Sequence, residues 1–472
     1  MGHPTVHPAG VTIYNPEKCF NGYTIFHAQE TGATLIDMNG GVVNLWEDLL
    51  GFPSVLLKGG YVIGNLGERN TNFGFQDQID LVQVDWDGNI VWKFNQLEYV
   101  EDPGEEPQWM ARQHHDFQRE GNPVGYYVPG MEAKTDGGNT LILCHHNLYN
   151  HEITDKNLLD DKIIEIDWQG NIIWEWTCNE HFHELGFSNA AKNALFRDPN
   201  QTKGGADWMH INCMAPLGPN KWYDSGDERF HPDNIILDGR QTNIMAIISK
   251  ETGKIVWKLG PYFGDEDAQK IGPIIGQHHT HMIPQGLPGA GNILIFDNGG
   301  WAGYDVPNEF CSTGNKALRR DHSRVLEIDP TTMKIVWQFT PREMGCLEPF
   351  HASHFYSPFI SSAQRLPNGN TLITEGSDGR LLEVTADHEL VWEYISPYWG
   401  QIFPINMVYR AYRYPYDYVP QLEKPAEVAI ERISEIDFRM PGAKGKEPQR
   451  RVKVAGTKGY KEVFGFCVQT EE

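Results

Sequence analysis

Hydrophobic and polar residues alternate in short segments along most of the chain, and six of these segments end on a tryptophan. Each segment begins with a turn of acidic or small polar residues, such as Asp-Gly or Thr-Gly, and continues with Val, Ile or Leu. Turns of this kind between alternating apolar residues are typical of β-hairpins. The six tryptophans are Trp46, Trp92, Trp174, Trp257, Trp337 and Trp392.

A second pattern precedes the tryptophan segments. An apolar strand follows a Gly-Asn turn, most clearly in 277–299 and 362–376, and a strand of the type Val-Leu-Glu-Ile-Asp comes next. Repetition of one strand-rich unit along a chain predicts a solenoid, propeller or array. We therefore expect an all-β fold, a six-bladed β-propeller with long loop insertions over residues 1–420. Residues 421–472 form a C-terminal extension, for which an edge strand, a subunit contact and a loose arm all stay open.

The repeats are unevenly spaced. A bare blade needs about 40–50 residues, whereas the intervals from Trp92 to Trp337 are nearly twice as long. The extra residues predict loop insertions, and insertions of a ring usually gather where it binds its ligands. Segment 179–197 is the best candidate for a short helix within an insertion.

Composition excludes several classes of partner. The net charge of −24 argues against a nucleic acid, because a phosphate backbone is met by clustered Lys and Arg. No apolar stretch is long enough for a membrane span. The seven cysteines contain no CxxC pair, so neither a zinc ribbon nor a disulfide framework is expected. The N-terminal residues lack the features of a secretory signal, which predicts a cytoplasmic protein, or a periplasmic one if a leader has been removed.

Histidines recur at one position of the repeat. Superposing the strand patterns aligns His115, His210 and His278, with Ser361 in the matching position of a later blade. The innermost strands of a propeller line its central channel, so we expect the three imidazoles to meet there. Strict alternation places His279 on the opposite side of its strand from His278.

Other candidate residues surround this position. His281 and His354 are the further histidines that we expect near the mouth of the channel. Arginine and amide side chains suit a tetrahedral oxyanion, although each arginine has a structural ion pair as its alternative. The candidate oxyanion-binding residues are Arg240, Asn212, Arg324 and Asn298.

Several of these motifs also occur in a known family. DWMHIN, QHHTHMIPQG, GNILIFDNG, SRVLEID, AQRLPNGNTLITEG and YRAYRYPYDY, in this order, resemble the arylsulfotransferase (arylsulfate sulfotransferase) family of bacterial six-bladed propellers. The resemblance implies transfer of a sulfuryl group from a phenolic sulfate ester to another phenol, without PAPS and through a sulfated histidine. No cofactor is then expected, and the partner is a small aromatic or sulfate-ester substrate.

The resemblance also suggests roles for residues. His210 matches the histidine of the family's DWxHxN motif, and His278 matches that of its QHDA motif. Arg240 or Arg324 would bind sulfate. The nucleophilic histidine is expected near the AQRLPNGN blade, where His354 and His351 are the candidates.

Two alternatives stay open. Converging neutral imidazoles also make a site for copper, zinc, iron or nickel, so a metal-dependent enzyme acting on a small aromatic substrate is the second hypothesis. Its ligands would be His115, His210, His278 and His281. The third hypothesis is a propeller that binds ligands or proteins without catalysis, because a fold does not dictate a function. The C-terminal extension is the expected contact if the protein forms a homo-oligomer.

Overall fold

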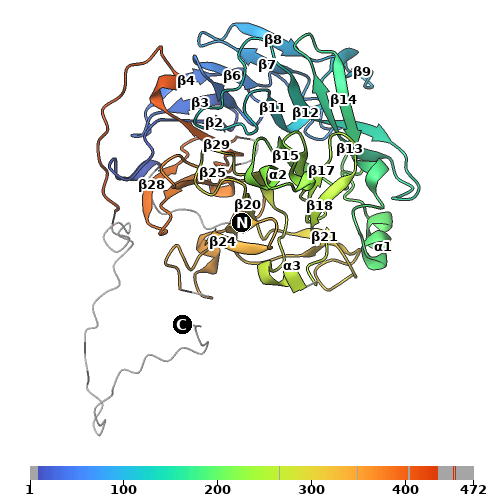
Figure 1. Cartoon of the computed structure of the whole chain (residues 1–472). Helices are drawn as coiled ribbons and strands as arrows, with labels where there is room; N and C mark the ends of the chain where they lie inside the picture. The colour runs from blue at the N-terminus through green and yellow to red at the C-terminus, as the bar shows by residue number, and fades with distance from the viewer. Residues whose placement is uncertain are drawn as a thin grey trace.

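Six antiparallel sheets surround a central axis as the blades of a β-propeller (Figure 1). The computed structural model describes residues 9–264, 266–347, 349–401 and 404–433, and residues 450 and 452. Five sheets have four strands and one has five. The predicted all-β class and the number of blades are both confirmed.

Each of the first five blades is a meander whose first strand is innermost. The first three blades comprise β5 (Val55–Leu57), β6 (Tyr61–Gly64), β7 (Leu81–Val84) and β8 (Ile90–Phe94); β11 (Gln113–Arg119), β12 (Thr140–Leu148), β13 (Leu158–Ile166) and β14 (Ile172–Thr177); and β15 (Ile211–Pro216), β16 (Ile235–Gly239), β17 (Ile244–Ile248) and β18 (Ile255–Leu259). The fourth and fifth comprise β19 (His278–Met282), β20 (Ile293–Asp297), β23 (Arg324–Asp329) and β24 (Lys334–Phe339); and β25 (Ser362–Arg365), β26 (Thr371–Glu375), β27 (Arg380–Val384) and β28 (Leu390–Ile395).

The two ends of the strand-forming region close the ring. The sixth blade takes its innermost strand, β29 (Ala411–Tyr414), from the end of the chain and the others, β2 (Tyr23–Ala28), β3 (Gly32–Ile36) and β4 (Val42–Trp46), from its beginning. In addition, β1 (Gly10–Tyr14) pairs with β28 at the outer edge of the fifth blade. The ring therefore closes by hydrogen bonds between strands that are distant in the sequence.

The repeated tryptophans join each blade to the next. Every one of them lies on the fourth strand of its blade, counted from the channel, and donates its indole N–H to a backbone carbonyl at the following blade's outer turn, over 2.9–3.1 Å. The sixth bond runs from Trp392 to Met38 O and completes the circle. We call these six residues the clasp tryptophans. Buried N–H donors need a partner, so the repeat places one bond at each blade boundary.

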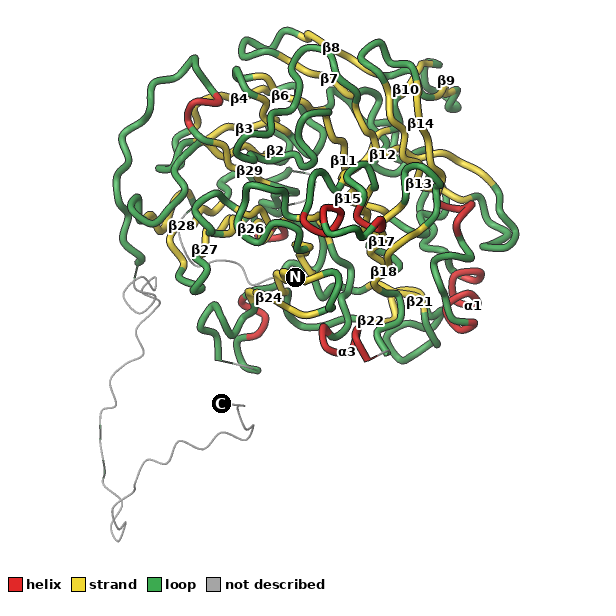
Figure 2. Tube along the Cα trace, in the orientation of Figure 1, coloured by secondary structure: helices red, strands yellow, loops and turns green. Residues whose placement is uncertain are grey.

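The insertions contribute short hairpins and helices at the periphery (Figure 2). They include β9 (Glu98–Val100) paired with β10 (Gln108–Met110), and β21 (Ala302–Tyr304) paired with β22 (Asn315–Leu318). The predicted helix over 179–197 is only partly formed, as the 3-10 turn Cys178–His181 and the helix α1 (Asn189–Arg197), which begins after the N-cap Ser188. The remaining helices are α2 (Lys221–Asp224) and α3 (Glu266–Ile271).

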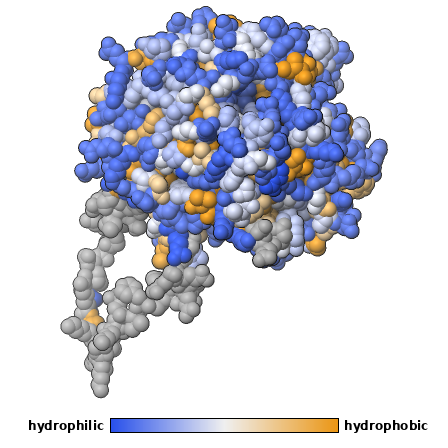
Figure 3. Space-filling view, viewed as in Figure 1, coloured by the Kyte–Doolittle hydropathy of each residue, from blue (hydrophilic) through white to orange (hydrophobic). Residues whose placement is uncertain are grey.

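The surface of one face is mostly hydrophilic, with scattered apolar residues (Figure 3). None of the helices in the described residues is long and apolar enough to cross a membrane. After β29 the chain follows the outside of the ring, where Ile430 and Tyr14 exchange backbone hydrogen bonds of 2.8 and 2.9 Å. Most of the predicted C-terminal extension 421–472 lies outside the described residues.

Candidate active site

The innermost strands of three consecutive blades begin irregularly. The strand register shifts between Gln113 and Phe117, between Ile211 and Cys213, and between His278 and His281. Near these shifts, His115, His210 and His279 have φ values of 54°, 52° and 55°, which non-glycine residues rarely adopt. Bulges turn side chains away from strict alternation and are frequent beside active sites.

Blades two and three bring four imidazoles together at this end of the channel. The rings of His115 and His210 are 4.7 Å apart. His114 Nδ1 lies 2.8 Å from His115 Nδ1, and the ring of His114 stacks on that of His145 with 3.6 Å between centroids. We call His114, His115, His145 and His210 the mouth cluster. The structure therefore brings together two of the three histidines predicted to converge.

His210 is oriented by a buried carboxylate. Its Nδ1 lies 2.5 Å from Oδ2 of Asp207. Trp208, which follows Asp207 in the sequence, packs in the core and donates its indole N–H to Asp160. Although burial opposes the effect, the neighbouring His210 holds the pKa of Asp207 below its ordinary value. The His210 side chain is 13% exposed, and its Nε2 has no hydrogen-bond partner among the described residues. A carboxylate on Nδ1 leaves a lone pair on Nε2, as a nucleophile or base requires.

Arg240 is hydrogen-bonded to the backbone of His210. The backbone N–H of Arg240 donates to His210 O over 3.0 Å, and the Nη1 atom of its side chain donates to Gln241 Oε1 over 3.3 Å. Within the described part of the chain no carboxylate lies at ion-pair distance from this guanidinium, and burial lowers the pKa of Arg240 to about 10, so it stays charged at neutral pH. Lys316, on β22, lies near enough for the positive charge of Arg240 to lower its pKa further, after burial has done so. Neither cation has a carboxylate at ion-pair distance among the described residues, although the charge of Asp207 acts on both. Two neighbouring cations of this kind suit an anion.

Three aromatic rings surround the mouth cluster. Phe52 and Tyr409 lie 5.9 and 5.8 Å from His115, and Phe75 lies 6.3 Å from His210. Phe52 and Phe75 are half-buried, so part of each ring is open. Aromatic faces at these distances offer a surface for another ring. Sequence reasoning named none of the three, because they come from blades one and six and from a loop without a repeat motif.

His278 holds two strands together instead of facing the channel with a free nitrogen. Its Nδ1 lies 2.7 Å from Asn298 Oδ1, and its Nε2 accepts the N–H of Ile360 over 3.1 Å. Asn298 in turn donates to Ser357 O and Ile360 O. Both ring nitrogens of His278 are thus occupied, and Asn298 serves the same connection between blades four and five.

Further along the channel lies a second group, Tyr126, His279, His281 and Tyr412, which we call the inner cluster. His279 Nδ1 lies 3.0 Å from Ala363 O and its Nε2 lies 3.2 Å from Tyr412 Oη. His281 Nδ1 lies 2.8 Å from His279 O and its Nε2 lies 2.8 Å from Tyr126 Oη. Burial lowers the pKa of His281 to about 4. All four ring nitrogens are satisfied, and both imidazoles are neutral.

The other predicted oxyanion-binding residues are occupied elsewhere. Arg324 pairs with Asp297, Nη2 to Oδ2, over 2.7 Å and donates to the carbonyls of Ile271 and Pro273. Asn212 donates to Gln277 O over 3.0 Å, across the boundary between blades three and four. For Arg324 the structural ion pair, the alternative weighed from the sequence, is what the structure has.

His354 lies in a 3-10 turn, Ala352–His354, between β24 and β25. It is exposed, and its ring stacks on that of His351 with 4.7 Å between centroids. The contacts described above contain two other histidines, His114 and His145, for which the sequence suggested no role. The acid Asp207, three residues before His210, was available as a signal in the motif DWMH.

One group in the described residues has the composition and spacing of a metal centre. The ligand atoms of His114, His145 and Asp161 all lie within 4.8 Å of one another, and all three residues are buried. Burial, with the charges of Asp207 and Asp160, raises the pKa of Asp161 well above its ordinary value. The metal ligands hypothesised from the sequence were His115, His210, His278 and His281, and two of these have both nitrogens in hydrogen bonds.

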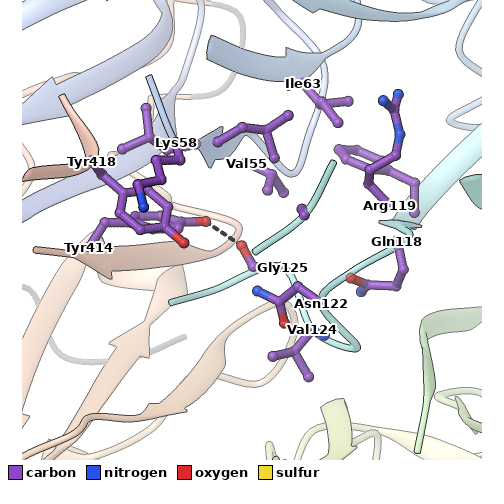
Figure 4. A pocket seen from close by; sticks show the side chains of 14 residues that line it. Val55, Lys58, Ile63, Gln118, Arg119, Asn122, Val124, Gly125, Tyr414 and Tyr418 are labelled. Carbon is purple, nitrogen blue, oxygen red and sulfur yellow. Dashed lines mark hydrogen bonds between the residues drawn. The ribbon is translucent and has the colours of Figure 1, made fainter. Parts of the chain in front are cut away.

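The other end of the innermost strands is filled. Figure 4 shows the hollow where β5, β11 and β29 end, with Tyr414 donating its hydroxyl to Gly125 O. Its free volume is only about 10 Å³. A larger cavity of about 440 Å³ opens beside Gln118 and Arg119, at the same end of β11. Segment 122–128 supplies Gly125 and Tyr126 to this end, so the mouth cluster and the plugged end are opposite ends of one channel.

Fold and site together define a six-bladed propeller with a histidine, carboxylate and arginine constellation at the start of its innermost strands. Residues 131–394 match the sequence profile of the arylsulfotransferase (ASST) family. The match covers more than half of the chain, and the protein belongs to this family. Membership supports a transferase-like enzyme that transfers sulfuryl groups. A search of curated proteins finds none that matches the sequence.

Solved structures similar to this chain are distant. A protein of unknown function from Bacteroides caccae has 10% identity and a TM-score of 0.43, over 83% of this chain and 98% of that one. A streptogramin B lyase has 12% identity and a TM-score of 0.36, over 86% and 93%. Virginiamycin B lyase from Staphylococcus aureus has 11% identity and a TM-score of 0.33, over 82% and 84%.

Proposed function

We propose that this protein transfers a sulfuryl group from an aryl sulfate to a phenol, with His210 as the nucleophile. The observation that carries the proposal is the pair formed by His210 and Asp207 beside Arg240. It joins an oriented, partly exposed imidazole, whose Nε2 has a lone pair, to a guanidinium that has no carboxylate at ion-pair distance among the described residues. The family resemblance pointed to His354 or His351 as the nucleophile, but both are exposed at a surface turn.

The first half-reaction forms a sulfated histidine. The lone pair of His210 Nε2 attacks sulfur, an N–S bond forms, and the S–O bond to the aryl group breaks with its electron pair leaving on the phenolate. Asp207 stabilises the imidazolium that results, as the aspartate of a catalytic triad does. Arg240 and Lys316 hold the sulfuryl oxygens, where charge is concentrated throughout the transfer.

The second half-reaction reverses the first with another phenol. The acceptor reacts as its phenolate, after the phenol has lost its proton to solvent; its oxygen attacks sulfur, the N–S bond breaks, and the electron pair of that bond returns to His210 Nε2. The ring of His115 lies 4.7 Å from that of His210, between centroids, and is placed to hydrogen-bond the phenolic oxygen in both steps. Burial, with the charge of His210, lowers the pKa of His115 well below its ordinary value, so it acts as a neutral imidazole. Phe52, Phe75 and Tyr409 offer faces for the aryl groups.

Trapping the intermediate tests the proposal. The protein is incubated with p-nitrophenyl sulfate without an acceptor, and its peptides are analysed by mass spectrometry at neutral pH. One sulfuryl group is expected on the peptide that contains His210, released when a phenol is added. It should be absent from His210→Ala and present in the matched control His354→Ala. A sulfuryl group on His354, or transfer without any labelled histidine, would overturn the assignment.

A further inference from the structure

The mouth cluster contains acceptor atoms that the proposed transfer does not use. Nε2 of His114 and Nε2 of His145 are buried and have no hydrogen-bond partner in the part of the chain that the structure describes. Asp161 is fully buried, and its Oδ1 lies 3.3 Å from His114 Nε2 without the alignment of a hydrogen bond. Buried polar atoms are nearly always satisfied. Two unsatisfied nitrogen atoms beside a buried carboxylate therefore need an explanation.

A buried carboxylate, that of Asp77, determines which ring nitrogen of His145 carries the proton. Its Nδ1 lies 2.6 Å from Asp77 Oδ1, and Asp77 is itself held by Arg112 at 2.9 Å and Arg69 at 3.1 Å. Because two arginines hold Asp77 as a carboxylate, Asp77 accepts a hydrogen bond from His145 Nδ1–H. The opposite nitrogen, Nε2, then has a bare lone pair when the ring is neutral. A carboxylate behind the imidazole is the usual support of a metal-ligating histidine.

We propose that His114, His145 and Asp161 bind one divalent transition-metal ion, with Zn²⁺ as the best fit. Two imidazole nitrogens and one carboxylate oxygen are the ligand types of zinc sites with three protein ligands. Bond lengths of about 2 Å would draw the three side chains slightly together. Oδ1 of Asp207 is also buried and has no hydrogen-bond partner among the described residues, and the Asp207 carboxylate interacts electrostatically with both Asp161 and His145, so it lies near the proposed site.

The site has a consequence for His115. A metal on His114 Nε2 places the ring proton of His114 on Nδ1, which then donates to His115 Nδ1 across their 2.8 Å contact. His115 would present Nε2–H towards its neighbours. The use of this donor in catalysis rests on the proposed sulfuryl transfer, in which it would meet the phenolic oxygen. Metal binding by His114, His145 and Asp161 does not rest on that proposal.

Metal uptake by the full-length, untagged protein tests the site. The protein is stripped with a chelator, dialysed and titrated with Zn²⁺, and bound metal is measured by mass spectrometry of the elements. One equivalent per chain is expected. Co²⁺ in its place should give the visible absorption of a nitrogen and oxygen site. Failure of the wild-type protein to take up a stoichiometric ion would overturn the proposal without any variant.

Variants assign the ion to these residues. Asp161→Asn keeps an acceptor for the N–H of Ile211, which Asp161 accepts at 3.2 Å, and should weaken binding at least about 100-fold. His114→Gln should do the same. The control His183→Gln changes an exposed histidine that pairs with Glu152 at 3.0 Å, and should leave binding unchanged. Full binding by folded Asp161→Asn and His114→Gln would place the metal elsewhere and overturn the proposal.

The two proposals can fail separately. His210→Ala should lose sulfuryl transfer and still bind one equivalent of Zn²⁺. A protein that binds the metal but transfers no sulfuryl group supports the metal site alone.

Discussion

The mouth cluster and the inner cluster contain the same residue type in the same channel, yet their hydrogen bonding differs. In the inner cluster every imidazole nitrogen has a partner, from tyrosine hydroxyls or backbone carbonyls. In the mouth cluster, Nε2 of His114, His145 and His210 has no hydrogen-bond partner among the described residues. A histidine with both nitrogens bonded stabilises the fold, whereas one with a free lone pair can bind a metal or attack an electrophile.

The largest expected effect is on the rate of sulfuryl transfer, at His210, whose free lone pair would attack sulfur. Replacing His210 by alanine should lower the rate of sulfuryl transfer at least about 10³-fold, because no other group at the site would form the intermediate. Initial rates with p-nitrophenyl sulfate and a phenol measure it. His183→Ala, at an exposed position, is the control. A rate within about tenfold of the wild type would remove the distinction between the two clusters.

The second largest expected effect is a loss of stability when Arg410, which contacts the inner cluster, is replaced. Arg410 is fully buried and pairs with Asp116 at 3.1 Å, and it donates to Tyr409 Oη and Tyr412 Oη. Arg410→Met leaves Asp116 buried without its partner, so we expect a loss of about 3–5 kcal/mol in the free energy of unfolding. Chemical denaturation measures it. A double variant with Asp116→Leu should lose less. A loss below about 1 kcal/mol in the single variant would contradict this structural role.

A substitution of Arg240 is expected to affect substrate binding and to leave stability almost unchanged. Arg240→Met removes a cation that has no ion pair to break, so stability should change little. KM for p-nitrophenyl sulfate should rise roughly 10–100-fold, the range of one or two charge-assisted hydrogen bonds. Steady-state kinetics on donor and acceptor give both constants. Arg324→Met, which breaks the pair with Asp297, should show the reverse, with lower stability and an unchanged KM. The opposite pattern would make Arg324 the sulfate-binding residue.

The pH dependence of stability probes the backbone between His279 and His281. Asp238 accepts the N–H of Thr280 over 3.0 Å, and burial raises the pKa of Asp238 to about 7. A raised carboxyl pKa contributes stability that is complete below the unfolded-state pKa of about 4 and is lost as the pH rises towards 7. Relative to Asp238→Asn, the wild type should therefore lose about 2 kcal/mol between pH 5 and pH 8.

Denaturation midpoints of both proteins at the two pH values give this difference. The lowered pKa of His281 acts with the opposite sign as the pH falls, but it is common to both proteins and cancels. A parallel pH dependence of the two proteins would mean that Asp238 is ionised throughout.

The smallest effect tests one bond of the inner cluster. Tyr126→Phe removes the hydroxyl at 2.8 Å from His281 Nε2, which should cost about 1 kcal/mol of stability. The transfer rate should stay within about twofold. Thermal unfolding and initial rates on one preparation measure both quantities. A rate loss above about tenfold would show that the inner cluster takes part in the chemistry.

The sequence predicted the scaffold well because the scaffold is periodic. Six tryptophan segments specify six outer strands, and each requires a neighbouring turn for its indole N–H. The convergence of His115 and His210 was predictable for the same reason, since equivalent strands share one channel. The motif DWMH also contained the acid Asp207 that orients His210.

The remaining features of the site depend on contacts that no period describes. The bulges at His115, His210 and His279 change which way each side chain points, and alternation alone could not anticipate them. Lys316 arrives on a hairpin inserted into the fourth blade. The occupied nitrogens of His278 depend on Asn298 and Ile360, and only a structure shows that such a histidine is a connector.

The fluorescence of the clasp tryptophans reports on whether the ring is closed. They are six of the fourteen tryptophans, and each reports on a different boundary between blades through one indole N–H. If any boundary opens, that N–H exchanges a carbonyl for water and its emission shifts to the red. In six variants, each with five clasp tryptophans replaced by phenylalanine, the emission above that of the eight other tryptophans would report on a single boundary between blades.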